Sequence, residues 1–559
     1  MWVYHRGKGT APPERFVREG YNRQKERNNI MRQYETFELT FTGPEPEGSR
    51  ALADVKAEFT LSGKTKEVKG FYAGAGLYKV RFYPADAGKC CWKVWGVVSG
   101  EGEEMCEPAD VQKAADGVSG ARQKAPHGMV RVEGMHFRYE DGTWYRPFGT
   151  TVYAMVHQEK DLVDTTMETL RRSPFNKVRF CVFPKHYDFN HNDPVHYPFE
   201  KTDGKWDVHK PVNAYWEALE ARIRELDEMG IQGDLILFHP YDRWGFSELA
   251  KEDCLVYLEY LLRRLSAMPN LWWSLANEYD LMPKYKREDW TDFIRFAAAH
   301  DPYGHCLSNH NCMAYWDFEQ KEVTHCCIQD ANVNEVPELW EQYGKPVVFD
   351  ECRYEGNIIH SWGNISAREM VRRFWTAMCC GGYCTHGETF YNEEEVLWWA
   401  KGGVLRGESP ARIAFLREIV ETLPGPLDFL GEGIGVWKAG QLAAMQESRA
   451  SKGAGAAFEE LYGDTFFMAM LDLPKERMRP FLLKERVALA HCGKEAYLKF
   501  MERQCAVLTQ LMLPEEGSYR IELIDTWEMT RKVVMENVNG TVKIELPGKE
   551  DMAVLAVRE

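Results

Sequence analysis

The chain has 559 residues, 28% of them charged, and a formal net charge of −16. This length is too great for one hydrophobic core and predicts roughly two to four domains. No apolar run approaches the roughly 18 residues of a membrane-spanning helix, and nucleic-acid binding needs a basic surface that an acidic chain disfavours. We therefore expect no membrane and no nucleic-acid partner, and a neutral, hydroxyl-rich ligand suits the composition better.

Residues 1–33 are expected to form an N-terminal extension. They contain no apolar segment of the kind that marks a secretory signal, so the sequence predicts a cytoplasmic protein. The fifteen cysteines include adjacent pairs, such as Cys90-Cys91 and Cys379-Cys380, whose geometry is poor for mutual disulfides. Reduced thiols are consistent with the same compartment.

Residues 34–106 alternate between apolar and polar side chains. Phe37, Leu39 and Phe41 share one face of a strand, and glycine and proline turns separate such runs. This period of two predicts a small antiparallel, Ig-like β-sandwich. Residues 107–125 are rich in alanine, aspartate and glycine without apolar periodicity, and we interpret them as a linker.

Residues 126–426 alternate between apolar strand-like runs and amphipathic helices, a pattern typical of parallel strands joined by crossover helices. Eight such runs predict an α/β fold of the (β/α)8 TIM-barrel type. The predicted strands are 147–152, 177–183, 233–238, 271–276, 306–309, 324–328, 346–349 and 383–386.

Beyond residue 426 the period of two returns, and residues 427–559 are expected to form a second β-sandwich. Its predicted strands are 465–471, 494–500, 518–524, 542–546 and 553–557. Neither sandwich shows a distinct binding motif, so we assign structural roles to both. Their surfaces would be available for assembly into a homo-oligomer.

Two glutamates each end an apolar run of the barrel. Glu278 follows the fourth predicted strand, and Glu351 ends the seventh. Burying a carboxylate costs several kcal/mol unless the group is paired or used, and active sites of such barrels lie at the carboxyl ends of the strands. The pair therefore predicts a retaining glycoside hydrolase, with Glu278 as general acid/base and Glu351 as nucleophile.

Polar and aromatic residues near the other strand ends are expected to bind the sugar. We expect Arg179 to hold Glu351 ionised, and Asn277 to bond a hydroxyl near the anomeric centre. Strict alternation would put Asn277 and Glu278 on opposite faces, so the strand must bend or end there. The predicted substrate-binding residues are Arg179, His239, Asn277, His310, Gln329, Trp362, His386, Glu388, Trp398 and Trp399.

Long loops are expected to cover this site. The segment 185–212 after the second strand exceeds the usual length of a strand-to-helix loop, and the loops holding Trp362 and Trp398-Trp399 offer platforms for sugar rings. A crowded rim favours exo-acting removal of one terminal sugar from a small oligosaccharide or glycoside.

Three other readings compete with this one. A metal site near His325-Cys326-Cys327 or Cys384-Thr-His386 fails the spacing of structural zinc sites, so we predict no metal and no cofactor. Cys352 as a nucleophile lacks an evident general base. The remaining alternative is a catalytically silent carbohydrate-binding protein on a barrel scaffold.

The strand-end motifs resemble those of a known group of enzymes. Asn277-Glu278 and Glu351 resemble the acid/base and nucleophile of glycoside hydrolase clan A, and Arg179 and His239 are similar to its strand-two arginine and strand-three histidine. More closely, three segments resemble a bacterial family of glycoside hydrolases with an apiosidase-like barrel flanked by β-sandwich domains of unknown function. These segments are Ser308-Asn-His-Asn311, Gly344-Lys-Pro-Val-Val-Phe-Asp-Glu-Cys352 and Gly381-Gly-Tyr-Cys-Thr-His-Gly-Glu388. The resemblance spans residues 34–557 and implies the same three-domain order.

Overall fold

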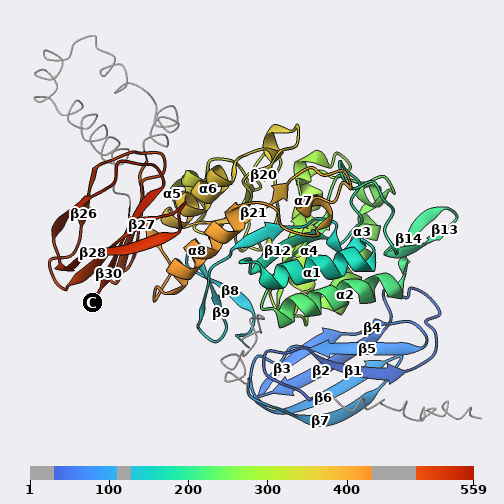
Figure 1. Ribbon diagram of the computed structural model, residues 1–559. Coiled ribbons are helices and arrows are strands. Elements are labelled where there is room, and N and C mark those ends of the chain that lie inside the picture. Colours follow the sequence, from blue (N-terminus) through green and yellow to red (C-terminus); the bar gives the residue numbers. More distant parts are fainter. Residues whose placement is uncertain (1–29, 110–126, 431–485) are drawn as a thin grey trace, which may run out of the picture.

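The computed structural model describes residues 30–109, 127–430 and 486–559. A central barrel of strands and helices contacts one group of strands from the N-terminal part of the chain and another from the C-terminal part, on different sides (Figure 1). The N-terminal extension up to residue 29, residues 110–125 of the predicted linker and the predicted strand 465–471 lie outside the described residues.

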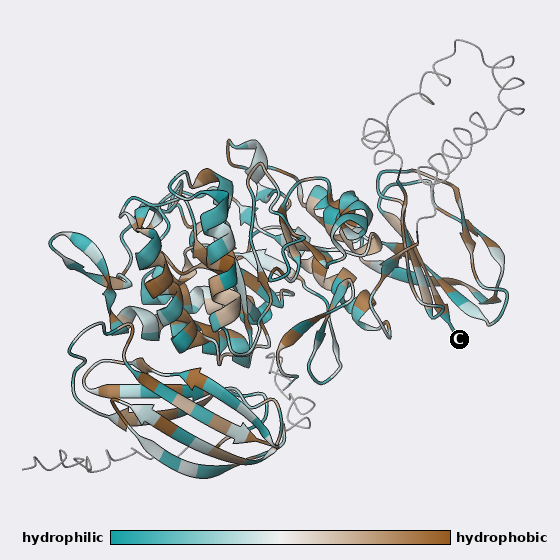
Figure 2. Ribbon diagram, turned by 180° about the vertical axis from the view of Figure 1, so that it is seen from behind, coloured by the Kyte–Doolittle hydropathy of each residue, from teal (hydrophilic) through white to brown (hydrophobic). Residues whose placement is uncertain are grey.

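The N-terminal strands form two antiparallel sheets, which confirms the predicted sandwich. One sheet has the order β1 (Phe37–Thr42), β5 (Leu77–Phe82), β4 (Phe71–Tyr72); the other has the order β3 (Lys64–Lys69), β2 (Val55–Leu61), β6 (Gly88–Gly96), β7 (Gly100–Cys106). Every second side chain of β2 is buried, because alternate residues of a strand face the partner sheet. The same alternation gives these strands their banded colouring in Figure 2.

The barrel contains all eight predicted strands, in one parallel sheet. Their sheet order is β17 (Leu307–Ser308), β16 (Leu271–Ala276), β15 (Gln232–Phe238), β12 (Lys177–Cys181), β11 (Gly149–Thr151), β21 (Tyr383–His386), β19 (Val347–Glu351), β18 (Cys326–Gln329). A bridge between His310 and Cys327 brings the two ends of this sheet together. The (β/α)8 prediction is confirmed.

Helices surround the strands and bury apolar stripes against them. They are α1 (Lys160–Arg172), α2 (Asn213–Glu228), α3 (Lys251–Leu265), α4 (Arg287–His300), α5 (Val336–Tyr343), α6 (Ala367–Cys379), the short α7 (Trp398–Lys401) and α8 (Ser409–Glu421). In α1, for example, Val163, Met167 and Leu170 recur at helical spacing and are buried. No helix in the described ranges is both long enough and apolar enough to span a bilayer.

Two small antiparallel elements accompany the barrel. The sequence did not predict the first, formed by β8 (Val130–Glu133), β9 (His136–Tyr139) and β10 (Trp144–Tyr145), in which Phe137 packs 4.8 Å from the ring of Trp272. The second is the hairpin β13 (Phe199–Thr202) and β14 (Lys205–Pro211), which lies within the long loop after β12.

The C-terminal strands form a six-stranded and a two-stranded sheet. The larger has the order β23 (Asp428–Phe429), β24 (Ala488–Cys492), β25 (Ala496–Phe500), β30 (Met552–Arg558), β27 (Tyr519–Asp525), β28 (Thr530–Val538), and the smaller pairs β26 (Leu508–Met512) with β29 (Thr541–Glu545). The predicted strands 494–500, 518–524, 542–546 and 553–557 are confirmed as β25, β27, β29 and β30.

The two sandwiches differ in how much apolar surface they pack against the barrel. One face of the C-terminal sheet, with side chains such as Phe500 and Leu555, belongs to the same apolar core as the barrel, and its other face has a separate core. The N-terminal sandwich adds Phe71 to the barrel core but buries most of its apolar side chains in its own core, and Arg81 of β5 forms a buried ion pair of 2.7 Å with Glu220 of α2.

A buried ion cluster occupies the centre of the barrel. The Lys177 ammonium of β12 lies 2.5 Å from Asp234 of β15 and 2.6 Å from Asp350 of β19. Arg179, two residues along β12, lies 3.3 Å from the same Asp234. All four side chains are excluded from solvent, so each charge depends on the others for compensation.

Lys177→Met is expected to destabilise the barrel by about 3 to 5 kcal/mol, because it leaves Asp234 and Asp350 buried without their shared cation. Thermal or urea unfolding of the full chain measures the effect. Lys160→Met is the matched control, since Lys160 of α1 pairs with Asp164 on the exposed surface. An equal midpoint in both variants would contradict the expectation.

Candidate active site

The backbone turns sharply at Glu278. Strand β16 ends at Ala276, and Glu278 adopts a left-handed conformation with φ 54° and ψ 57° before the short helix Tyr279–Leu281. Such values are uncommon for residues other than glycine and cluster at functional sites. As a result, Asn277 and Glu278 both line one pocket. The strand ends before these two residues, which agrees with the expectation that it must bend or end there for both side chains to face the substrate.

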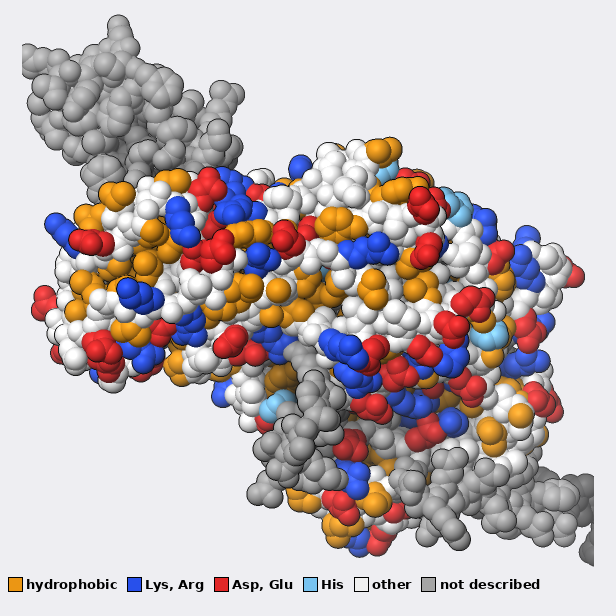
Figure 3. All heavy atoms as spheres, in the orientation of Figure 1, with side chains coloured by type: hydrophobic (Ala, Val, Ile, Leu, Met, Phe, Trp, Pro, Cys, Tyr) orange, Lys and Arg blue, Asp and Glu red, His pale blue; other side chains and the backbone are white. Residues whose placement is uncertain are grey.

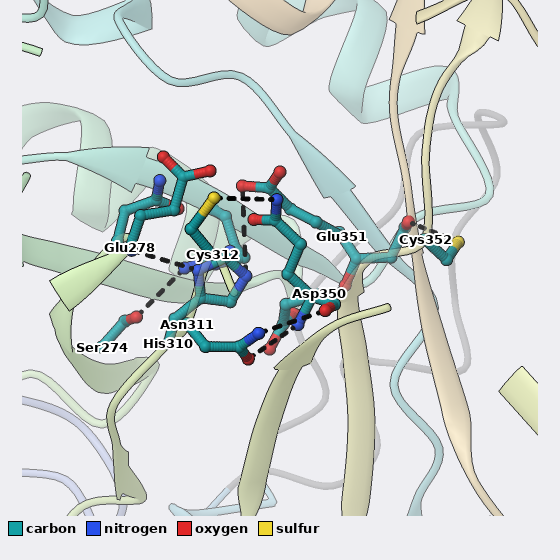
Figure 4. A network of polar contacts seen from close by, with 12 residues as sticks. Ser274, Glu278, His310, Asn311, Cys312, Asp350, Glu351 and Cys352 are labelled. Carbon is teal, nitrogen blue, oxygen red and sulfur yellow. Dashed lines mark hydrogen bonds and ion pairs between the residues drawn. The ribbon is translucent and has the colours of Figure 1, made fainter. Parts of the chain in front are cut away.

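Strand β19 changes register just before Glu351. Ile328 of β18 pairs with Phe349, but Gln329 pairs with Glu351, which leaves Asp350 as an extra residue. This bulge lets Asp350 and Glu351 lie on the same side of the strand, while Cys352 points to the other side (Figure 4). Asp350 reaches Lys177 of the ion cluster, and the carboxylates of Glu351 and Glu278 both lie above Asp350 in this view.

The two glutamates share a narrow pocket of about 90 Å³. Six of the twelve predicted site residues line it: Glu278, Glu351, Asn277, Gln329, Trp362 and Trp399. Five further lining residues were not predicted: Tyr153, Lys185, Tyr187, Tyr241 and Tyr354.

Two predicted residues lie beneath the pocket. Nδ1 of His310 is 3.4 Å from the backbone nitrogen of Glu278, and its Nε2 is 4.0 Å from Oε1 of Glu351. Burial, with the nearby charge of Arg179, lowers the pKa of His310 well below its usual value, so the ring is neutral. Arg179 itself is fully buried and donates a hydrogen bond of 3.1 Å to Ser274.

The other four predicted residues lie outside the pocket lining. His239 donates to the carbonyl of Phe183 at 3.0 Å. Trp398 donates to the hydroxyl of Thr150 at 2.9 Å, and His386 bonds the same hydroxyl at 3.1 Å. Glu388 accepts from the backbone nitrogen of Gly407 at 2.9 Å and from that of Arg406 at 2.5 Å. These contacts support the walls of the barrel mouth.

Each glutamate accepts a hydrogen bond from its own tyrosine. The Tyr153 hydroxyl donates to Oε1 of Glu351 and lies 3.2 Å from Oδ1 of Asn277, whereas the Tyr241 hydroxyl donates to Oε2 of Glu278. Both tyrosines lie a few residues beyond their strands, β11 and β15. A search that extended three residues past each strand end would have included them.

Burial raises the pKa of Glu351 from 4.5 to about 7, and the charge of Glu278 adds to the shift. Arg179 acts in the opposite direction but is outweighed. The expectation that Arg179 keeps the pKa of Glu351 low is therefore wrong, because loss of hydration costs this carboxylate more than the buried cation returns.

One group of side chains in the described ranges has the spacing of a metal site. The ligand atoms of Glu355, His386 and Glu388 lie within 4.8 Å of one another. However, Glu355 accepts from the backbone nitrogen of Ser409 at 3.2 Å, at the start of α8, and the Glu388 carboxylate accepts from the two backbone nitrogens named above. The N-terminus of α8 thus stabilises the carboxylate of Glu355, and the backbone just before the helix stabilises that of Glu388.

The ring of His386 also fits a metal poorly. Trp398 can only donate to Thr150, so the Thr150 hydroxyl is free to donate its proton to Nδ1 of His386. That arrangement places the ring proton on Nε2, which faces Glu388 at 4.0 Å. In this tautomer Nε2 cannot ligate a cation, and binding one would require the ring proton to move to Nδ1.

Chelation is therefore expected to leave the protein unchanged. Incubation with excess EDTA should not shift the thermal midpoint, and subsequent addition of Zn²⁺, Mn²⁺ or Ca²⁺ should not raise it. A midpoint that falls on chelation and returns with one of these ions would show that the Glu355, His386 and Glu388 group binds a metal.

Relative to wild type, Glu351→Gln is expected to stabilise the fold more at pH 8 than at pH 5. Since folding raises the pKa of Glu351 to about 7, its protonation favours the folded state below pH 4.5, and this contribution is lost as the pH rises through 7. A neutral glutamine avoids the loss, which amounts to about 3 kcal/mol. Unfolding at the two pH values measures the difference, with the exposed Glu217→Gln as control; an equal effect at both would contradict it.

Comparisons with known proteins agree with this architecture. A family model described as the apiosidase-like catalytic domain matches residues 132–417, slightly more than half of the chain. Two further models, both described as domains of unknown function, match residues 30–95 and 486–556. A search of curated proteins returned no match.

Two solved structures from Bacteroides vulgatus are similar to this chain. A candidate glycoside hydrolase is 30% identical, with a TM-score of 0.78, over 95% of this chain and 100% of that chain. A glycoside hydrolase of family 5 is 13% identical, with a TM-score of 0.56, over 79% of this chain and 95% of that chain, which shows a shared fold.

Proposed function

The chain belongs to the family of apiosidase-like catalytic domains and is a glycoside hydrolase, and from this premise we propose that it cleaves its substrate by double displacement with retention. One observation carries the proposal: Glu278 and Glu351, from strands four and seven of the barrel, line the same pocket. Retention needs two carboxyl groups that act on one anomeric carbon, one as acid/base and one as nucleophile.

Glu351 is assigned as the nucleophile and Glu278 as the acid/base. Glu351 attacks the anomeric carbon while Glu278 protonates the leaving oxygen; Glu278 then removes a proton from the water that releases the sugar. Glu351 must be ionised to attack, and the hydrogen bond from Tyr153 favours its ionised form. Activity should therefore rise with pH through the pKa of about 7.

The size of the pocket supports exo-action on a small substrate. About 90 Å³ is well below the roughly 300 to 1,000 Å³ of typical ligand sites, so the pocket accepts at most one small terminal sugar. Trp362 and Trp399 form aromatic walls for such a ring. Acidic and basic side chains are interspersed on the face shown in Figure 3, so this face offers no continuous basic surface for a phosphate backbone.

Glu351→Ala is expected to abolish hydrolysis of aryl glycosides, because no covalent intermediate can form. Azide should enter the space left by the side chain and restore turnover, with a glycosyl azide of inverted configuration as product. Chromatography and proton NMR identify that product.

Glu278→Ala is the matched variant for the other carboxylate. It should keep part of the activity toward substrates with acidic phenol leaving groups, which need no protonation, and azide should then give a product of retained configuration. Full activity of Glu351→Ala without azide would remove the proposed nucleophile.

A further inference from the structure

Lys185 occupies an aromatic cage inside the pocket. Its Nζ lies 3.6 Å from the ring centre of Tyr153, 4.3 Å from Tyr241, 4.8 Å from Trp399 and 5.6 Å from Tyr187. The side chain is 4% exposed, and among the described residues its ammonium has no carboxylate within ion-pair distance. An ammonium withdrawn from water needs compensation, and ring faces supply only part of it.

Two rings of the cage belong to the tyrosines that bond the glutamates. Tyr153 donates to Glu351 and Tyr241 donates to Glu278, while the faces of both rings meet the same ammonium. A cation on the face of a phenol withdraws electron density and strengthens its hydroxyl as a donor. Lys185 therefore stabilises the ionised form of both carboxylates indirectly, that of Glu351 through Tyr153 and that of Glu278 through Tyr241.

The buried charges around the pocket balance when the glutamate pair carries one proton. Beneath the pocket the two cations of the ion cluster, Lys177 and Arg179, face its two aspartates. Lys185 then remains to compensate Glu278 and Glu351, so the site is neutral when one of these two is protonated. Double displacement starts from the form in which that proton is on Glu278 and Glu351 is ionised.

We propose that Lys185 is a positioning residue that supplies the counter-cation of the glutamate pair through Tyr153 and Tyr241, and that the reacting sugar is consequently uncharged. The inference rests on the proposed function, which it deepens. An anionic sugar would bring a second negative charge into a pocket where Lys185, the one cation among the described lining residues, already compensates the glutamate pair.

The pH dependence of activity tests this assignment. The titratable and charged groups that surround Glu351 are Glu278, Arg179, Lys185, Tyr153, Tyr241, Tyr354, His310, Cys181 and Cys312. Lys185→Met removes one cation from this set and should move the acid limb of kcat/KM for neutral aryl glycosides upward by about one pH unit. Activity below the limb then falls about tenfold, and Lys185→Arg should return the limb toward its wild-type position.

Two variants complete the design. Lys201→Met is the matched control, because the Lys201 ammonium also lies over a ring, 4.3 Å from the centre of Trp206, but in the hairpin β13–β14. The pH profile of this variant should equal that of wild type.

Tyr153→Phe keeps the ring face but removes the hydroxyl that bonds Glu351. It should therefore move the acid limb of kcat/KM in the same direction even if Lys185→Met does not fold. An unmoved limb in a folded Tyr153→Phe or Lys185→Met variant overturns the proposal.

The rival reading makes Lys185 the receptor for a substrate carboxylate. A wild type that hydrolyses aryl uronides in preference to neutral glycosides, together with selective loss of the uronides in Lys185→Met, would establish that reading and overturn ours. The expected result is hydrolysis of neutral glycosides alone.

A stability measurement separates this inference from the proposed function. Without its counter-cation the glutamate pair is harder to ionise, so Lys185→Met should lower the thermal midpoint more at pH 8.5 than at pH 5.5. An equal loss at both values would indicate packing alone and overturn the proposal. If the wild type cleaves no glycoside, the proposed function fails, and the midpoints still decide the role of Lys185.

Discussion

The cation of Lys177, held between Asp234 and Asp350, is the constraint on which the rest of the site depends. It ties β12, β15 and β19 together at the centre of the barrel, where no water can replace a lost partner. Because Asp350 is anchored there, the bulge in β19 is fixed, and Glu351 emerges above it toward the pocket. Arg179 extends the same cluster to the floor beneath the glutamates.

The sequence was most informative where burial is continuous. Parallel barrel strands are covered on both faces, so most of them appear as mainly apolar runs, and all eight could be counted. Strand β28 escaped prediction because it is an edge strand whose nine residues are all at least partly exposed, with no alternation to detect.

The residues of the candidate site that end a strand could be predicted from the sequence, but most of those in the loops could not. Glu278, Glu351, Asn277 and Gln329 terminate apolar runs, whereas Lys185 lies in a loop without periodicity. Trp398 and Trp399 are adjacent, and only the short helix α7 decides which of them lines the pocket. The direction of the pKa shift of Glu351 could be found only from the structure. A sequence can suggest which opposite charges pair, but it does not show how far burial removes water from a carboxylate.

The unequal way in which the two sandwiches join the barrel has a consequence for how the molecule unfolds. One face of the six-stranded C-terminal sheet, with residues such as Leu498, Phe500 and Leu555, belongs to the apolar core of the barrel, so that face and the barrel should lose their packing together. The N-terminal sandwich adds Ala51, Phe71 and Ala73 to that core, but most of its buried side chains form a separate core, and buried charges such as Arg81 and Glu220 complete the junction. Chemical denaturation should therefore meet two thresholds in this protein, and the boundary between them runs between the N-terminal sandwich and helices α2 and α3.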